Sequence, residues 1–154
     1  MVQQRVDSVL QQMTLEEKVQ LVTGRDYWGI AAIPSAGIPE INFANGPVGV
    51  RPESRTPLYP PGVADSVKTT SFPIPVALSS TWNRSLIGKT GKAMGLESRW
   101  KNIHCLLAPG MNIQRVPYGG RNFEYFSEDP YLTAESGISF IQGVQGEGVM
   151  VSVK

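Results

Sequence analysis

The stretch "INFANGPVGVR", residues 41–51, contains the pattern that decides the fold. It opens with a short, largely apolar run typical of a strand, and the run stops at Asn45, Gly46 and Pro47. Asn, Gly and Pro are residues that favour turns. The stretch therefore predicts a strand that turns outward at its end, with an amide at the turn and the guanidinium of Arg51 shortly after it.

Three other apolar segments are also predicted to be strands, and each is followed by polar or glycine-rich residues. They are "SFPIPVALSS" (71–80), "IHCLLAPGMNI" (103–113) and "VMVSVK" (149–154). The first contains two prolines, which cannot donate to a sheet, so that strand is expected to be irregular or to lie at an edge.

Helices are predicted before and between these strands. Apolar residues at helical spacing indicate a first short helix ending near Met13, and Thr14 with Glu17 forms a capping box that begins a second helix, which Gly24 can end. Asn83 is predicted to cap a helix that runs to about Trp100.

The last predicted helix begins at Asp129-Pro130 and ends at Gly146 or Gly148. Its inner face is expected to carry the large apolar residues, namely Tyr131, Ala134, Ile138 and Ile141. Three glycines near one face of the preceding helix, at positions 88, 91 and 95, predict close packing against another backbone.

Strands that alternate with helices favour an α/β fold with a mainly parallel sheet, preceded by short N-terminal helices. In such folds ligands bind at the carboxyl ends of the strands. Because the polar segments follow the predicted strands, they are expected to meet at that edge.

The composition limits the classes of function. The chain has 154 residues, 41% hydrophobic and 18% charged, with a formal net charge of +1, so no electrostatic feature favours nucleic acid or a membrane surface as a partner. Cys105 is the only cysteine, which excludes an intrachain disulfide, and no cluster of residues has metal-ligand spacing. The first residues lack the apolar core of a signal peptide, which predicts a cytoplasmic protein and leaves secretion of a longer parent open.

The loop "GGRNFEYFSEDP", residues 119–130, concentrates charged and aromatic side chains. Carboxylates near aromatic residues suit glycoside hydrolysis. Glu128 and Asp129 are interpreted as structural residues at a helix start. Glu124 is expected either to orient an arginine or to touch a ligand, and Arg121 is a candidate for ligand contact.

Five motifs in order resemble the N-terminal domain of glycoside hydrolase family 3, in its β-glucosidase branch. They are "MTLEEKVQLVTG", "GIPEINFANGPVGVR", "SFPIPVALSSTWN", "LLAPGMNIQRVPYGGRNFEYFSEDP" and the final "SVK", and together they extend over nearly the whole chain. The resemblance implies a (β/α)8 barrel and retaining enzymes that remove a β-linked sugar, usually glucose, from a non-reducing end. It implies no metal or organic cofactor.

The resemblance also implies roles for individual residues. The aspartate of the family's Asp-Gly-Pro motif, which binds sugar hydroxyls, falls on Asn45, and the arginine after it falls on Arg51. Arg121 matches the arginine of the Gly-Arg-Asn loop, and Lys154 matches the lysine of a Lys-His pair. Together with Glu124 these form the predicted substrate-binding set for a β-glucoside or another small β-linked saccharide, because charged and amide groups complement hydroxyls.

Two departures from the family pattern lead to expectations. A (β/α)8 barrel needs about 250 residues, so residues 1–154 are expected to form about the first half of one truncated barrel domain, with no second domain. The family's nucleophile, a late aspartate, and its glutamate acid/base from a later domain then have no counterpart, and the chain alone is expected to be inactive. Asn45 lacks the charge of aspartate, so weaker glucose binding is expected, by about 1.5–3 kcal/mol.

Alternatives to a fragment of a retaining β-glycosidase stay open from the sequence. One is a non-catalytic carbohydrate-binding or regulatory pseudo-enzyme fragment, and another is a structural fragment without a function of its own. Unpaired strand edges of a partial barrel also predict self-association. The identity of the sugar and of the aglycone depends on loops beyond these motifs.

Overall fold

A computed structural model describes residues 2–52 and 68–154 of the chain. It divides into two compact units, Met1–Asn42 and Phe43–Lys154. The first unit holds α1 (Val2–Gln12), α2 (Leu15–Thr23), β1 (Gly29–Ile30), the 3-10 helix η1 (Pro34–Ala36) and the beginning of β2 (Ile41–Asn45). The second holds the end of β2, α3 (Pro75–Ser79), α4 (Arg84–Trp100), β3 (Cys105–Leu107), the 3-10 helix η3 (Asn122–Glu124), α5 (Pro130–Gln145) and β4 (Met150–Val151).

The predicted start and end of α2 are confirmed. The Thr14 hydroxyl accepts the backbone N–H of Glu17, and the Glu17 carboxylate accepts that of Thr14. This pairing satisfies two backbone donors that a helix start otherwise leaves free. The Glu17 carboxylate accepts hydrogen bonds from the Ser35 hydroxyl and the Thr14 N–H, and these hold the pKa of Glu17 below its usual range. Gly24 then ends the helix with a φ of 74°, which suits glycine.

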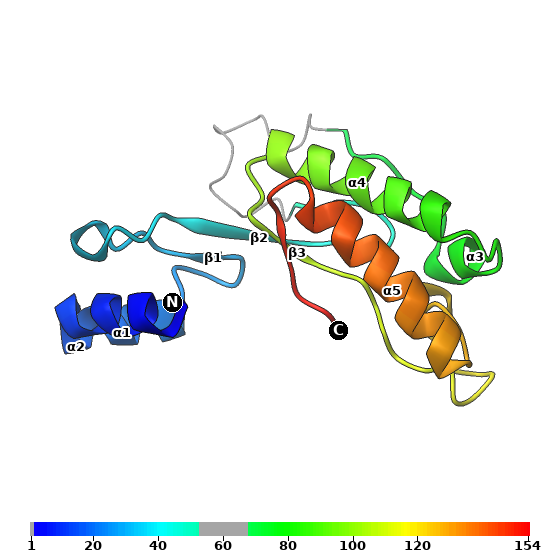
Figure 1. The fold of residues 1–154 in the computed structure, drawn as a ribbon, viewed down its shortest axis with the longest axis horizontal. Coiled ribbons are helices and arrows are strands. Elements are labelled where there is room, and N and C mark those ends of the chain that lie inside the picture. Colours follow the sequence, from blue (N-terminus) through cyan, green and yellow to red (C-terminus); the bar gives the residue numbers. More distant parts are fainter. Residues whose placement is uncertain (1, 53–67) are drawn as a thin grey trace. The chain divides into compact units, whose positions relative to one another are not determined.

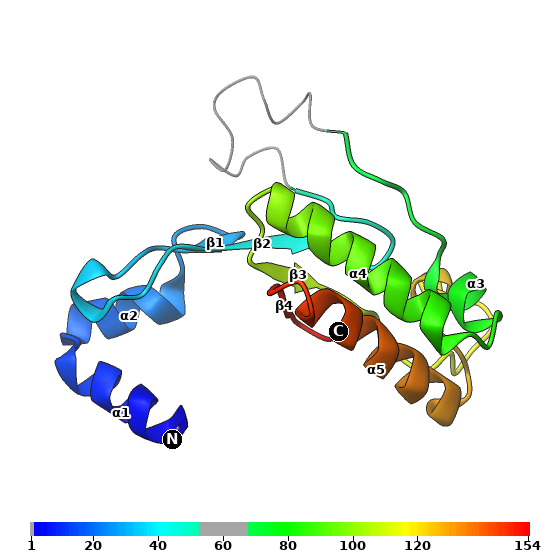
Figure 2. The same cartoon turned by 45° about the horizontal axis from the view of Figure 1, so that its top comes forward.

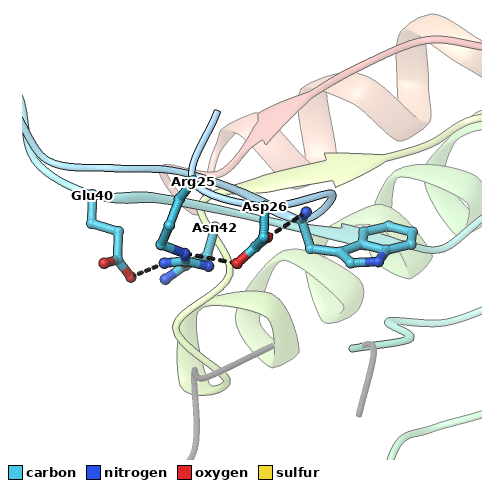
Figure 3. Close-up of polar contacts among 5 residues, drawn as sticks. Arg25, Asp26, Glu40 and Asn42 are labelled. Carbon is cyan, nitrogen blue, oxygen red and sulfur yellow. Dashed lines mark hydrogen bonds and ion pairs between the residues drawn. The ribbon is translucent and has the colours of Figure 1, made fainter. Parts of the chain in front are cut away.

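A network around Arg25 holds the β1–β2 hairpin of the first unit together (Figure 3). The guanidinium contacts Asp26 at 2.8 Å and Glu40 at 2.6 Å, and it donates to the Asn42 side-chain oxygen at 3.2 Å. Asp26 in turn accepts the backbone N–H of Trp28 at 2.6 Å. Because β1 pairs antiparallel with β2 through Gly29 and Asn42, these side chains fix the two strands in register. The hydrogen bond from Arg25 lowers the pKa of Asp26.

Three parallel strands form the sheet of the second unit. β3 lies between β2 and β4, with Asn45 opposite Leu107 and Leu106 opposite Val151. α4 and α5 run alongside each other beside these strands (Figures 1 and 2). The core between helices and strands is made of buried apolar side chains, among them Ala44, Leu106, Ile87, Met94, Phe140 and Val144. The α/β class with mainly parallel strands and N-terminal helices is thus confirmed.

The contact between α4 and α5 depends on glycines, as the sequence predicted. A Cβ atom added at Gly91 would overlap the backbone of Phe140, and one added at Gly143 would overlap the Gly88 carbonyl and lie 2.8 Å from the Lys92 nitrogen. Backbone atoms cannot rotate away as side chains do. The two helices therefore approach at a distance that only glycine permits at these positions.

The predicted strand at 71–80 is wrong. Residues 75–79 form the short helix α3, with Ile74 in an extended conformation before it and Pro75 at the first helical position. Proline is favoured there because its φ is already helical and its missing N–H has no partner to lose. The Ser79 and Ser80 hydroxyls donate to the Val76 carbonyl.

The predicted inner face of α5 is also wrong, although its N-cap Asp129 and its end at Gly146 are confirmed. Tyr131 and Ile138 are exposed, and the buried face instead comprises Thr133, Ser136, Gly137, Phe140 and Val144. This face lies against α4 where Phe140 and Val144 meet Gly91 and Gly95, and Gly137 lies against the Met111 side chain. Phe140 and Val144 also belong to the apolar core, so contacts outside α5 decide which of its residues are buried.

A glycine pair in this contact provides a test of the helix packing. We expect Gly143→Ala to lower the free energy of unfolding by about 1–3 kcal/mol, because the added methyl meets fixed backbone atoms. Gly88→Ala is the matched control, since its Cβ would have only an ordinary contact at 3.4 Å, and it should raise stability by up to about 1 kcal/mol through helix propensity. Urea denaturation measures both, and a Gly143→Ala chain as stable as the parent would contradict the close approach.

Candidate functional site

The carboxyl ends of β2, β3 and β4 meet at one edge of the second unit, because the three strands are parallel and in register. The segments that leave this edge are the turn after Asn45, the stretch that begins at Ala108, and the residues from Ser152 to Lys154. The sequence predicted polar groups at this edge. Asn45 is the last residue of β2, and Arg51 follows the turn after it. Arg121 and Glu124 lie in the stretch after Ala108, and Lys154 ends the third segment.

The turn after β2 is fixed on both sides. The Arg51 N–H donates to the Asn45 carbonyl at 2.8 Å, and the Phe72 N–H donates to the Val48 carbonyl at 2.9 Å. A Cβ at Gly46 would lie 2.6 Å from the Gly49 carbonyl, so the turn is as tight as glycine allows. The turn therefore holds Asn45 at the end of the strand in a defined position.

Lys154 is held at the same edge by the segment that follows β3. Its N–H donates to the Pro109 carbonyl at 3.2 Å, and its own carbonyl accepts the Met111 N–H at 2.6 Å. These backbone bonds continue the pairing between β3 and β4 beyond the ends of the strands. They place the lysine side chain next to the end of the sheet.

The side chains of Asn45 and Lys154 meet although they lie 109 positions apart in the sequence. The Lys154 ammonium donates to the Asn45 Oδ1 atom at 2.7 Å, and the Gly46 N–H donates to the same oxygen at 3.1 Å. Lysine has no acceptor, so the amide must present its oxygen, not its nitrogen, to the ammonium. The Nδ2 group of Asn45 is left without a partner among the described residues.

The loop after β3 is organised by Gln114, a residue that the sequence analysis did not single out. Its side-chain amide donates to the carbonyls of Asn122 at 2.9 Å and of Tyr125 at 3.0 Å. A Cβ at Gly110 would lie 2.6 Å from the Glu124 carbonyl, so this glycine lets η3 approach the sheet. The sequence around Gln114 carries no signal for this role, because its partners are brought to it by the fold.

Arg121 and Glu124 form an ion pair within this loop. The guanidinium contacts Glu124 Oε2 through Nη2 at 2.6 Å and through Nε at 3.2 Å. This hydrogen bond to Glu124 raises the pKa of Arg121. Of the two roles left open for Glu124, orienting an arginine is therefore the one that the structure contains.

The two pairs affect each other electrostatically. Burial lowers the pKa of Lys154, the charge of Arg121 lowers it further, and the negative charge of Glu124 acts in the opposite direction. The candidate site thus comprises a lysine–asparagine contact beside an arginine–glutamate ion pair. Arg51 joins it through its backbone bond to Asn45, and its side chain is exposed.

The other candidate residues have structural roles or none. The Asp129 carboxylate caps α5 by accepting the Leu132 N–H at 2.7 Å, as predicted. Cys105 is buried, and burial raises the pKa of its thiol.

Within residues 2–52 and 68–154, no group of three or more His, Cys, Asp or Glu side chains is arranged to hold a metal ion. In the same ranges no helix has the length and apolar character that crossing a membrane requires.

Comparison with known proteins defines the class. The family model described as the glycosyl hydrolase family 3 N terminal domain matches residues 61–154. The chain therefore belongs to glycosyl hydrolase family 3, as the motifs indicated.

Individual relatives agree with this assignment. The chain is 43% identical over 149 residues to thermostable beta-glucosidase B of Acetivibrio thermocellus. This match covers 97% of the chain and 20% of the relative. It is 44% identical over 142 residues to an exo-alpha-(1->6)-L-arabinopyranosidase of Bifidobacterium longum, covering 92% of the chain and 19% of the relative. The chain thus spans about a fifth of the length of these curated relatives.

Solved structures show the same fold. Beta-glucosidase 3B from Thermotoga neapolitana, in complex with glucose, has a TM-score of 0.85 and 41% identity. The match covers 97% of this chain and 22% of the Thermotoga chain. The beta-glucosidase from Kluyveromyces marxianus, also in complex with glucose, has a TM-score of 0.86 and 39% identity. The match covers 97% of this chain and 17% of the Kluyveromyces chain. The described sheet and helices correspond to the first part of the family's barrel domain.

Glu124 and Arg121 act on the pKa of Lys154 in opposite directions, so replacing each of them tests the arrangement. We expect Glu124→Gln to lower the pKa of Lys154 and Arg121→Gln to raise it, because the first removes a stabilising anion and the second a repelling cation. Arg115→Gln is the control for loss of a positive charge on the same loop. The measurement is an NMR titration of the Lys154 ammonium, and shifts of the same sign in both variants would contradict the arrangement.

Proposed function

We propose that the chain supplies part of the sugar-binding subsite of a retaining β-glycosidase of the β-glucosidase type, which hydrolyses O-glycosyl bonds at non-reducing ends. The observation that carries the proposal is the contact between Lys154 and Asn45 at the carboxyl edge of the sheet, at 2.7 Å. Three separate parts of the chain supply the predicted binding residues, which are Asn45, Arg51, Arg121, Glu124 and Lys154. Their ligand is a β-glucoside or another small β-linked saccharide.

The chemistry of these groups supports a saccharide. A sugar hydroxyl both donates and accepts, and charged donors and acceptors form its stronger hydrogen bonds. Lys154 and the Asn45 amide nitrogen donate, and the Glu124 carboxylate accepts. The complexes of two related structures with glucose support the same class of ligand. The arabinopyranosidase among the relatives means that family membership by itself does not select the sugar.

We further infer that this chain alone does not perform the hydrolysis. Retaining hydrolysis needs a nucleophile and an acid/base, usually two carboxylates about 5–5.5 Å apart across the bond that is cleaved. Among the carboxylates of the loop, Glu124 is paired with Arg121 and Asp129 caps α5. Neither is free to act as the nucleophile, and the proposal assigns the catalytic pair to parts of the family's fold beyond these residues.

The same observation favours a second function, a non-catalytic carbohydrate-binding or regulatory protein. Donors and acceptors for a sugar are present at the edge, while Glu124 is paired with Arg121 and Asp129 caps α5. The two functions share the binding step and differ in turnover, so one binding and one kinetic measurement separate them.

Binding can be tested with methyl β-D-glucopyranoside and NMR of the ¹⁵N-labelled chain. We expect chemical-shift changes at Asn45, Gly46 and Lys154. We expect Asn45→Asp to bind this glucoside about 10- to 100-fold more tightly, because a carboxylate accepts charge-assisted hydrogen bonds from hydroxyls. Lys154→Ala should abolish the changes, whereas Lys89→Ala on α4 is the control. Unchanged or weaker affinity in Asn45→Asp would contradict the assigned role.

Turnover can be tested with an aryl β-glucoside. We expect no release of the aryl group by the purified chain above the rate in buffer, since the covalent route requires a nucleophile and the proposal assigns none to the described residues. A β-glucosidase of full family length, assayed alongside, shows that the conditions support hydrolysis. Hydrolysis by the chain that survives further purification would refute this inference.

A further inference from the structure

We propose that the Asn45–Lys154 pair selects a sugar that bears a carboxylate, a β-linked uronic acid, over the corresponding neutral glucoside. The inference rests on the proposed function, since it takes this edge as the saccharide-binding surface. It adds the chemical class of the sugar, and it follows from which hydrogen-bonding groups the two side chains leave free.

The first step concerns the Asn45 amide. Its oxygen accepts from the Lys154 ammonium at 2.7 Å and from the Gly46 N–H at 3.1 Å, which occupies both lone pairs. Its nitrogen has no partner among the described residues. Toward a ligand Asn45 therefore offers donors only.

The second step concerns Lys154. An ammonium has three N–H donors and no acceptor, and the contact with Asn45 uses one of them. Its one described side-chain partner is thus a neutral amide, and it forms no ion pair with any residue in the described ranges. The lysine charge is consequently not neutralised by a neighbouring carboxylate in direct contact.

The third step concerns the surrounding charge. Glu124 is the carboxylate that influences Lys154, but its Oε2 atom already receives two N–H groups of Arg121. The groups that interact are then two cations, Lys154 and Arg121, and a single anion, Glu124. These three side chains carry a net positive charge, and both Asn45 and Lys154 offer donors to a ligand.

These features complement a carboxylate better than a hydroxyl. An ionised carboxylate has two oxygens and accepts hydrogen bonds without donating any, so it can take one from the amide and one from the ammonium. A hydroxyl brings a hydrogen that finds no free acceptor on this pair. A uronic acid therefore matches both the donor pattern and the charge.

The experiment compares methyl β-D-glucopyranosiduronate with methyl β-D-glucopyranoside in NMR titrations of the ¹⁵N-labelled chain. We expect the uronate to bind about tenfold more tightly, to shift the Asn45 side-chain amide, and to lose affinity with added salt, while the glucoside is insensitive to salt. Asn45→Asp should remove the preference or reverse it, because the carboxylates repel.

Asn102→Asp provides the matched control. It makes the same change of charge three residues before β3, at the amino end of the parallel sheet and therefore at the edge opposite Asn45. It should leave the preference for the uronate unchanged. The comparison of two ligands on the unaltered chain needs no variant, so the test stands even if a substitution impairs folding.

Each outcome bears on the proposal. If the glucoside shifts Asn45 and Lys154 and binds as tightly as the uronate, the selectivity is wrong while the proposed function stands. If neither sugar shifts these residues, both fail. The inference is also overturned if acetate binds as tightly as the uronate with the same shifts, which indicates a site for small anions, or if Asn102→Asp changes the preference as much as Asn45→Asp.

Discussion

The parallel pairing of β2, β3 and β4 is the constraint on which the candidate site depends. Side chains at the ends of β2 and β4 can meet only because the register places Asn45 opposite Leu107 and Leu106 opposite Val151. Parallel strands need long crossover connections, and here α4 and α5 provide them. The glycine-dependent contact between α4 and α5 therefore helps to hold the connected strands side by side, as the strand pairing does.

Local chemistry explains which parts of the fold could be predicted. The capping box at Thr14, the N-caps at Asn83 and Asp129 and the helix end at Gly24 each depend on a few adjacent residues, and each is found in the structure. The helix at 75–79 was missed because its prolines were interpreted as interruptions of a strand, although Pro75 suits the first position of a helix. The buried face of α5 was missed because it depends on contacts with α4 and with Met111, which no pattern within α5 reveals.

The candidate site divides in the same way. The types of residue at the carboxyl edge and the ion pair between neighbouring Arg121 and Glu124 lie within reach of sequence reasoning. The role of Gln114, whose amide bonds to two carbonyls of the loop, does not, because its partners lie eight and eleven residues away in irregular structure. Which atom of Asn45 faces Lys154 is likewise decided by a residue 109 positions distant.

That last point changes how a single substitution is interpreted. Considered alone, an asparagine in the place of an aspartate is a weakened acceptor. In the fold, Lys154 and the Gly46 N–H occupy the amide oxygen, so the Asn45 side chain keeps only its donors. Under the proposed function, the substitution then changes the kind of group that the edge would recognise and not merely the strength of binding. An aspartate in the same place could bind Lys154 through one oxygen and accept from a hydroxyl through the other. The physical distinction between the two residues is thus donor against acceptor, and the lysine contact imposes it.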